Sequence, residues 1–198
     1  MKGFILQMNN KTVKLAVFAS GTGSNFHAIL KDKSLRKHIA LLISDRPGAR
    51  AIEIAKRYDI PTFVFNPKDF KNKIAYEEQI KQEIDSREID LMILAGYMRL
   101  IGDTLLSVYE GKIINIHPSY LPNFPGKDAI GQALRAEVDT TGVTIHYVDS
   151  GMDTGPIISQ EEVLITKEDT LESLTRKIQA VEHRLYPKVI KQLMEDLT

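Results

Sequence analysis

Short apolar runs alternate with amphipathic segments along this chain, and this alternation constrains the fold more than any other feature. The runs lie at residues 13–19, 39–44, 62–65, 89–97 and 112–117. A strand that is apolar along its whole length is buried on both faces, as in a parallel sheet covered by helices on two sides. The pattern therefore predicts an α/β fold with a doubly wound, mostly parallel sheet.

The amphipathic segments between these runs predict the helices that cover the sheet. One helix is expected at residues 25–31, and another within "RPGARAIEIAKRYDIP". A third is expected within "NKIAYEEQIKQEID", where a charged face lies opposite an apolar stripe of Ile74, Tyr76, Ile80 and Ile84.

The character of the sequence changes after Pro118. A proline-rich loop, "PSYLPNFPG", precedes a predicted helix at residues 127–136. The segments "GVTIHYVD" and "GPIISQEEVLI" predict two further strands, which "SGMDT" would join as antiparallel neighbours. The expected sheet is thus parallel at first and antiparallel near its C-terminal end.

A long helix is expected in the last part of the sequence. Asp169 is the predicted N-cap, with Glu172 three residues later. Pro187 is expected to kink or break the helix, because proline lacks the backbone N–H of a helical bond. The apolar face consists of Leu171, Leu174, Ile178, Val181, Leu185, Val189 and Leu193.

The 198 residues suffice for one α/β domain with a substantial core. We expect residues 1–198 to form a single domain, with 1–12 as a flexible tail. Basic and acidic residues number 26 each, so no net charge draws the chain toward nucleic acid or a membrane. Cysteine is absent, and no apolar run approaches the roughly 20 residues of a membrane-spanning helix. We expect a cytoplasmic protein.

The segment "SGTGSNF" connects the first strand to the first helix and resembles a phosphate-binding corner. No lysine follows Gly23, which argues against the loop of nucleoside triphosphatases. Phe26 takes the place of the third glycine in the dinucleotide fingerprint, although Asp45 lies where a ribose-binding acid belongs. A nicotinamide-dependent dehydrogenase and a plain strand–helix turn remain alternatives at this stage.

The residue types in this corner also suit a single phosphate. Gly21 and Gly23 allow a tight turn, and Ser24 and Asn25 are able to cap the helix and to donate side-chain hydrogen bonds. The free N–H groups and the dipole of a helix start favour an anion.

A polar pair ends the fifth predicted strand, in "NIHPSYLP". Asn115 and His117 are two residues apart, so their side chains point to the same face. Pro118 ends the strand and places the pair near the carboxyl edge of the sheet, where open α/β folds bind ligands. Histidine is the usual proton donor or acceptor near neutral pH, and an asparagine amide stabilises an oxyanion.

Two aspartates, Asp149 and Asp153, bracket the loop between the last two strands. If this loop folds back over the fifth strand, Asp153 pairs with His117 and favours its charged form. Solvated turn residues are the simpler interpretation. A metal site of His117, His146 and Asp153 is an alternative, but no short-spaced ligand pair supports it.

Taken together, these segments resemble the phosphoribosylglycinamide formyltransferase family over nearly the whole chain. The resemblance lies in "FASGTGSNF", "LAGYMRLI", "INIHPSYLPNFPG", "TGVTIHYVDSGMDTGPII" and "VEHRLYP", in that order. It implies a Rossmann-like formyltransferase fold. It also implies transfer of the formyl group of 10-formyltetrahydrofolate to the glycyl amine of glycinamide ribonucleotide, in de novo purine biosynthesis.

The resemblance also implies roles for single residues. Asn115, His117 and Asp153 match the catalytic trio, in which Asn115 and His117 stabilise a tetrahedral intermediate and Asp153 keeps His117 charged. Gly23, Ser24, Asn25 and Glu182 match residues that bind the ribonucleotide. The folate is expected along Lys73, Met98, Arg99, Leu100, Ile101, Asn115, Asp149, Ser150, Gly151, Met152 and Asp153, with no metal.

One departure is "KDAIGQAL" after "FPG", where many relatives carry a histidine-rich stretch, so Lys127 and Asp128 receive no catalytic role. Methionyl-tRNA formyltransferase and formyltetrahydrofolate hydrolase share the trio but normally carry a further domain, for which this length leaves no room. The hydrolase, a nicotinamide-dependent dehydrogenase and a non-catalytic nucleotide-binding module remain the alternatives. The expected partners are the two small substrates, without nucleic acid or membrane, in a monomer or a homodimer.

Overall fold

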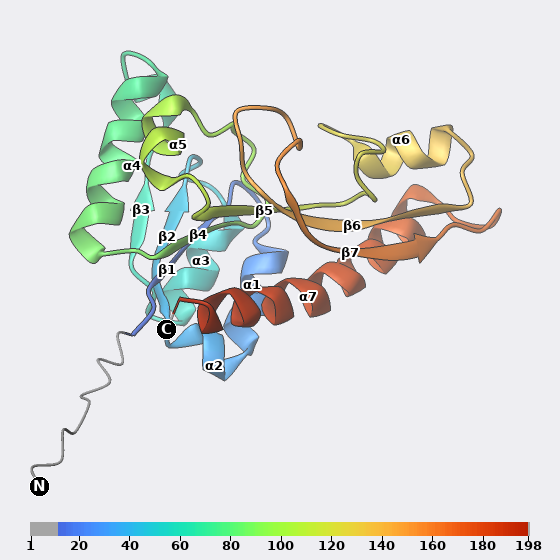
Figure 1. The fold of residues 1–198 in the computed structure, drawn as a ribbon, viewed down its shortest axis with the longest axis horizontal. Helices are drawn as coiled ribbons and strands as arrows, with labels where there is room; N and C mark the ends of the chain where they lie inside the picture. Colours follow the sequence, from blue (N-terminus) through green and yellow to red (C-terminus); the bar gives the residue numbers. More distant parts are fainter. Residues whose placement is uncertain (1–11, 198) are drawn as a thin grey trace, which may run out of the picture.

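A single seven-stranded sheet forms the centre of the protein (Figure 1). The computed structural model describes residues 12–197, so most of the expected N-terminal tail lies outside the described residues. The strand order is β3-β2-β1-β4-β5-β6-β7. The strands are β1 (Leu15–Phe18), β2 (Ile39–Ser44), β3 (Thr62–Val64), β4 (Leu91–Leu94), β5 (Ile113–His117), β6 (Thr140–Tyr147) and β7 (Ile157–Leu164).

The sheet changes direction at β5. The pairs among β1 to β5 are parallel, whereas β6 runs antiparallel to both β5 and β7. This arrangement confirms the predicted doubly wound, mostly parallel sheet with an antiparallel portion near the C-terminal end.

Helices cover both faces of the sheet, and each covered face has its own apolar cluster. One cluster joins Leu15 and Val17 of β1 to α1, α3 and α7, and the other joins Ala16 and Phe18 to α4 and α5. The helices are α1 (Ser24–Lys31), α2 (Lys33–Arg36), α3 (Arg50–Arg57), α4 (Lys73–Arg87), α5 (Asp103–Tyr109), α6 (Ala129–Arg135) and α7 (Leu171–Glu195), with a 3-10 turn η1 (Pro67–Asp69).

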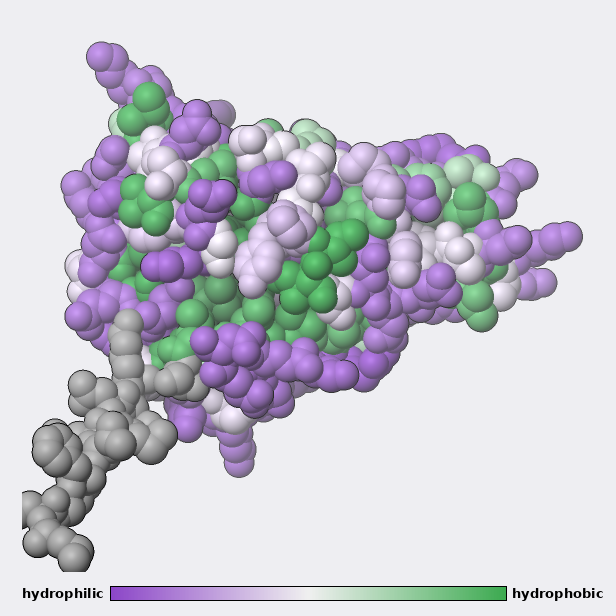
Figure 2. Space-filling view, in the orientation of Figure 1, coloured by the Kyte–Doolittle hydropathy of each residue, from purple (hydrophilic) through white to green (hydrophobic). Residues whose placement is uncertain are grey.

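Hydrophobic and hydrophilic residues are unevenly distributed over the surface. On the face seen in Figure 2, hydrophobic residues gather in the middle of the molecule, between hydrophilic margins. None of the helices in residues 12–197 is long and apolar enough to cross a membrane.

The expected apolar stripe of α4 was wrong at one position. Ile74 is 61% exposed, whereas Tyr76, Ile80 and Ile84 are buried. Ile74 and Tyr76 are two residues apart, a spacing that places side chains on opposite sides of a helix. The acidic residue Glu77, three residues before Ile80, is buried on the apolar side instead.

The N-cap expected for the last helix was wrong. It is Thr170 rather than Asp169, because Thr170 and Ser173 form a reciprocal capping box. Pro187 was expected to kink or break the helix, and it does not break α7, which continues to Glu195. Pro187 is buried, as are Tyr186 and Val189 beside it in the sequence.

Candidate active site

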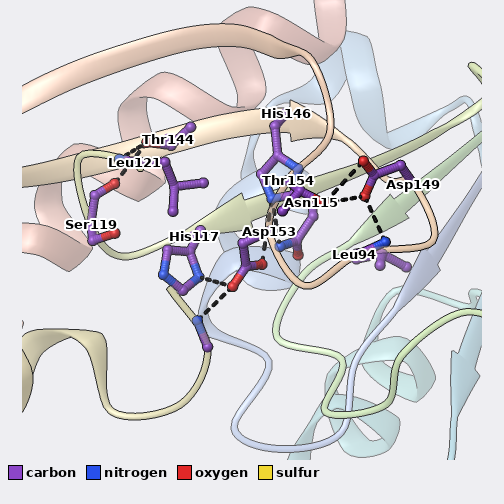
Figure 3. Close-up of polar contacts among 12 residues, drawn as sticks. Leu94, Asn115, His117, Ser119, Leu121, Thr144, His146, Asp149, Asp153 and Thr154 are labelled. Carbon is purple, nitrogen blue, oxygen red and sulfur yellow. Dashed lines mark hydrogen bonds and ion pairs between the residues drawn. The ribbon is translucent and has the colours of Figure 1, made fainter. Parts of the chain in front are cut away.

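The predicted polar pair lies on β5, the strand at which the sheet changes direction. Asn115 and His117 both line one large cavity, which confirms that they share a face of the sheet. In Figure 3, Asp153 of the β6–β7 loop points at His117, with Asn115 and His146 close by. The loop does fold back over β5, as expected.

Both ring nitrogens of the buried His117 face acceptors. Nδ1 lies 3.4 Å from Oδ2 of Asp153, and Nε2 lies 2.9 Å from the backbone carbonyl oxygen of Phe124. Only a doubly protonated imidazole donates to both acceptors at once. The surroundings of His117 therefore suit an imidazolium that has one N–H held by a fixed carbonyl and the other directed at a carboxylate.

Asp153 is fixed by backbone as well as by side-chain contacts. Its Oδ2 also accepts a hydrogen bond of 2.7 Å from the backbone N–H of Gly126. Its pKa is held below the usual value by His146 first, and also by the Gly126 N–H and by His117, while partial burial acts in the opposite direction. Asp153 is thus an anion at neutral pH, in direct contact with the histidine.

His146 lies between Asn115 and Asp153. Its Nε2 is 3.2 Å from Nδ2 of Asn115 and 3.6 Å from Oδ1 of Asp153, and its Nδ1 is 2.8 Å from the backbone oxygen of Tyr147. Without a proton, Nε2 accepts a hydrogen bond from Asn115, and with a proton it faces the carboxylate. In the first case one N–H of the Asn115 amide is occupied and the other remains available to a ligand.

The β6–β7 loop that carries Asp153 is stabilised internally. Oδ1 of Asp149 accepts hydrogen bonds from the backbone N–H of Gly151, at 3.0 Å, and from the hydroxyl of Thr154, at 2.8 Å. Asp153 itself has a left-handed backbone conformation, with φ of 58°. The loop is therefore a closed turn that holds a non-glycine residue in an uncommon conformation beside His117.

A second polar pair lies at another end of the cavity. Nδ2 of Asn25, in α1, donates a hydrogen bond of 3.1 Å to Oε2 of Glu182, in α7. Burial raises the pKa of Glu182 to about 7, against the opposing effect of this hydrogen bond. Among residues 12–197, Oδ1 of Asn25 is buried and has no hydrogen-bond partner, so it is able to accept a hydrogen bond from a ligand.

The glycine corner differs in detail from the prediction. The N-cap of α1 is Gly23, with φ of 70° and no side-chain cap, so the expected capping by Ser24 or Asn25 is absent. The first turn of α1 thus keeps its backbone N–H groups free of side-chain caps. Asp45, considered as a ribose ligand, is buried and paired with Ser20 and Arg99 instead.

The cavity measures about 640 Å³ and contains most of the predicted ligand-binding residues. Met98 and Leu100 are 64% and 56% exposed on its wall, and Met152 and Leu171 are exposed there too, so exposed apolar side chains gather at this cavity. Predicted residues that line it are Asn25, Met98, Arg99, Leu100, Ile101, Asn115, His117, Asp149, Gly151, Met152, Asp153 and Glu182.

Four predicted residues do not line this cavity: Gly23, Ser24, Lys73 and Ser150. Lys73 begins α4, and its Nζ lies 3.7 Å from Oε1 of Glu77. Contact of Lys73 with a folate tail remains a prediction.

Several contributors were not found by sequence reasoning. The carbonyl of Phe124 and the N–H of Gly126 are backbone groups, which leave no signature in residue types. Lys127 and Asp128 also line the cavity. His146 was considered only as a metal ligand, and within residues 12–197 no group of three or more His, Cys, Asp or Glu is arranged to hold a metal ion.

The fold agrees with the protein family that the sequence matches. Residues 13–190 match the formyl transferase family, and the chain belongs to it. It is 56% identical over 184 residues to a phosphoribosylglycinamide formyltransferase of Bacillus subtilis, covering 91% of this chain and 94% of that protein.

Solved structures agree with this comparison. The crystal structure of phosphoribosylglycinamide formyltransferase from Bacillus halodurans has 54% identity and a TM-score of 0.89, covering 93% of this chain and 97% of the other. That of glycinamide ribonucleotide transformylase 1 from Geobacillus kaustophilus has 58% identity and a TM-score of 0.89, covering 92% and 99%.

Proposed function

We propose that this protein is an enzyme that transfers the formyl group of 10-formyltetrahydrofolate to the glycyl amine of glycinamide ribonucleotide, a step of de novo purine biosynthesis. The observation that carries this proposal is the contact of Asp153 with His117 inside a cavity that most of the predicted folate residues line, together with Asn25 and Glu182 of the predicted ribonucleotide site.

The cavity suits two small molecules placed end to end. Its volume of about 640 Å³ is typical of small-molecule sites. The apolar side chains of Met98, Leu100 and Met152 offer a surface for a flat ring system, and Asn25 with Glu182 provides polar partners for a hydroxylated, charged substrate. A formyl donor and an amine acceptor would then meet between these two ends, where Asn115 and His117 lie.

Asn115 and His117 act on the oxygen of the formyl group. As the amine attacks, negative charge develops on that oxygen, and the free N–H of Asn115 and a proton on His117 stabilise it. Both ring nitrogens of His117 face protein acceptors, so the ring has to exchange one of these contacts for the formyl oxygen as the charge develops. His117 then serves as the proton donor when the folate amine leaves.

Asp153 supports His117 and balances its charge. The short loop and the Gly126 N–H fix the carboxylate, so the imidazolium keeps one orientation. The carboxylate is also a base for the proton that the attacking amine loses, directly or through water.

The ribonucleotide is held by Gly23, Ser24 and Asn25 through its phosphate and by Glu182 through its polar groups. The uncapped start of α1 offers N–H groups to the phosphate. The folate lies along Met98, Arg99, Leu100, Ile101 and Asn115, with Lys73 near its tail and residues 149–153 over its ring.

We further propose that residues 1–198 form a single formyltransferase domain that works in the cytoplasm as a monomer or a homodimer, without nucleic acid. The single sheet supports one domain, and the balance of 26 basic and 26 acidic residues supports small-molecule partners over nucleic acid. Sedimentation at several protein concentrations tests the state of association, and cell fractionation tests the location.

The direct test is a formyl-transfer assay. The purified protein is mixed with glycinamide ribonucleotide and 10-formyltetrahydrofolate, and formylated ribonucleotide is detected by mass spectrometry alongside loss of the formyl folate. Formation of the formylated product supports the transferase. No turnover, or equal loss of formyl groups without the ribonucleotide, overturns the proposal, and the latter outcome favours the hydrolase.

The assigned roles predict separable effects on rate and binding. Replacing His117 by Ala or Asp153 by Asn should lower kcat about 100- to 1,000-fold, as does loss of one oxyanion donor elsewhere. Calorimetric titration should still detect both ligands, because neither side chain supplies most of the contact surface. Full activity in either variant would refute the roles given to these residues.

A further inference from the structure

Residues 96–102 connect β4 to α5 and contain the stretch that faces the cavity at Met98–Ile101. We call this segment the donor loop. Much of this loop has no regular secondary structure. The side chains of Met98 and Leu100 are exposed, whereas that of Ile101 is buried. An irregular segment that exposes two large apolar side chains needs anchors outside the cavity to keep one conformation.

The first anchor is Asp45, which directly follows β2 and has a side chain only 1% exposed. One carboxylate oxygen accepts a hydrogen bond of 2.7 Å from Nε of Arg99. The other accepts from the hydroxyl of Ser20, and that hydroxyl accepts a bond of 2.9 Å from the backbone N–H of Met98. Asp45 thus holds two consecutive residues of the donor loop.

The second anchor is Glu77 of α4, which is 2% exposed. Its Oε1 accepts a hydrogen bond of 2.7 Å from the backbone N–H of Gly102, the N-cap of α5. A methyl group added at Gly102 would come within 2.6 Å of Oε2 of Glu77 and 2.8 Å of Cε of Lys73. The glycine is therefore needed for the close approach of the carboxylate.

Neither Asp45 nor Glu77 lines the cavity. A buried carboxylate is costly to keep, and each of these two is paired with a group of the donor loop: Asp45 with Arg99 directly and with the Met98 amide through Ser20, and Glu77 with the amide of Gly102. Because neither carboxylate lines the cavity, an effect of either one on a ligand passes through the loop.

We infer that Asp45 and Glu77 are positioning residues that hold the donor loop in its ligand-binding shape before the formyl donor arrives. The inference rests on the proposed function for the identity of the ligand. A preformed loop lowers the entropic cost of binding. Loss of either anchor should therefore weaken binding of the formyl donor and leave the ribonucleotide end of the cavity unaffected.

The test uses Asp45→Asn and Glu77→Gln, which preserve size and remove charge. Each should raise KM for 10-formyltetrahydrofolate about 3- to 10-fold, the effect of ordering one or two residues on binding. KM for glycinamide ribonucleotide and kcat should stay within about twofold. Asp32→Asn is the control, because Asp32 also pairs with a lysine, Lys191, but lies at α2, among the residues that do not line the cavity.

Hydrogen exchange of the ligand-free protein gives a second readout that does not depend on activity. The amide of Met98 should exchange faster in Asp45→Asn and that of Gly102 faster in Glu77→Gln, with no change in Asp32→Asn. If Asp45→Asn does not fold, Ser20→Ala replaces it, since it removes the acceptor of the Met98 amide and its link to Asp45 but keeps the pairing of Asp45 with Arg99.

Two results overturn the inference: unchanged exchange at Met98 and Gly102, or an equal rise of both KM values. A wild-type protein without turnover would refute the proposed function alone. Faster exchange in the variants would then still support the anchoring of the loop.

Discussion

The protonation of Glu182, a single residue of this cavity, makes the stability of the fold depend on pH. Glu182 lies in α7 with its side chain buried, and the amide of Asn25 donates a hydrogen bond to its carboxyl group. Burial raises its pKa from 4.5 to about 7. The folded protein therefore binds more protons here than the unfolded chain between these two pH values, and its stability falls as the pH rises through that interval.

This pH dependence predicts that a substitution at position 182 stabilises the fold. Glu182→Gln removes the ionisation, so the variant should be more stable than the wild type by up to about 3 kcal/mol at pH 8, with a much smaller difference at pH 5. Urea denaturation at both pH values measures this. Glu172→Gln, at a side chain 80% exposed, should show no such dependence. A pH-independent difference at position 182 would contradict the assigned pKa.

For single residues, the sequence predicted which side chains belong to the site better than it predicted the backbone groups that contact them. The alternation of a strand sufficed to place Asn115 and His117 on one face. The pairing of His117 with Asp153 required a loop to fold back, which spacing allowed and the family resemblance favoured. The carbonyl of Phe124 could not be foreseen, because any residue at that position supplies the same backbone oxygen.

At the scale of helices and strands, the start of α1 packs closely against α3. Gly23 has φ of 70°, and a Cβ there would lie 2.9 Å from Ala51 of α3. Glycine at this position therefore sets both the turn and the distance between two helices.

A pair of glycine substitutions tests this packing. Gly23→Ala should lower the free energy of unfolding by about 1–3 kcal/mol and raise KM for the ribonucleotide, because strain and overlap act together. Gly21→Ala is the matched control: a Cβ there meets nothing within 4 Å, so a change below about 0.5 kcal/mol is expected. Equal effects of the two substitutions in urea denaturation would show that the close approach to α3 has no energetic importance.

Helix faces were predicted less well than the class of sheet. In α4, an apolar residue two positions from Tyr76 was assigned to the core, while the buried Glu77 was assigned to the solvated face. Apolar periodicity cannot identify a buried acid, since its partner is a backbone N–H of a distant loop. The parallel sheet was more predictable, because continuous apolar strands leave few alternatives to a sheet that is covered on both faces.

At the scale of the whole molecule, ligand binding should stabilise the fold. With glycinamide ribonucleotide at 100 times its Kd, linkage predicts about 2.7 kcal/mol. For a domain of this size, that corresponds to a rise in Tm of roughly 5–10 °C. Differential scanning fluorimetry with the ribonucleotide, and with NAD as the comparison, measures it. A shift with NAD and none with the ribonucleotide would favour the dehydrogenase instead.

The hydrogen bond between Asn25 and Glu182 joins positions 157 apart in the chain. The hydroxyl of Tyr186, also in α7, donates to the backbone oxygen of Leu94 at the end of β4. On the ribosome, α1 and the parallel strands emerge long before α7, so the nascent chain has neither partner for them. The part of the cavity that contains Asn25 and Glu182 is therefore complete only after α7 has been synthesised and has docked against the sheet.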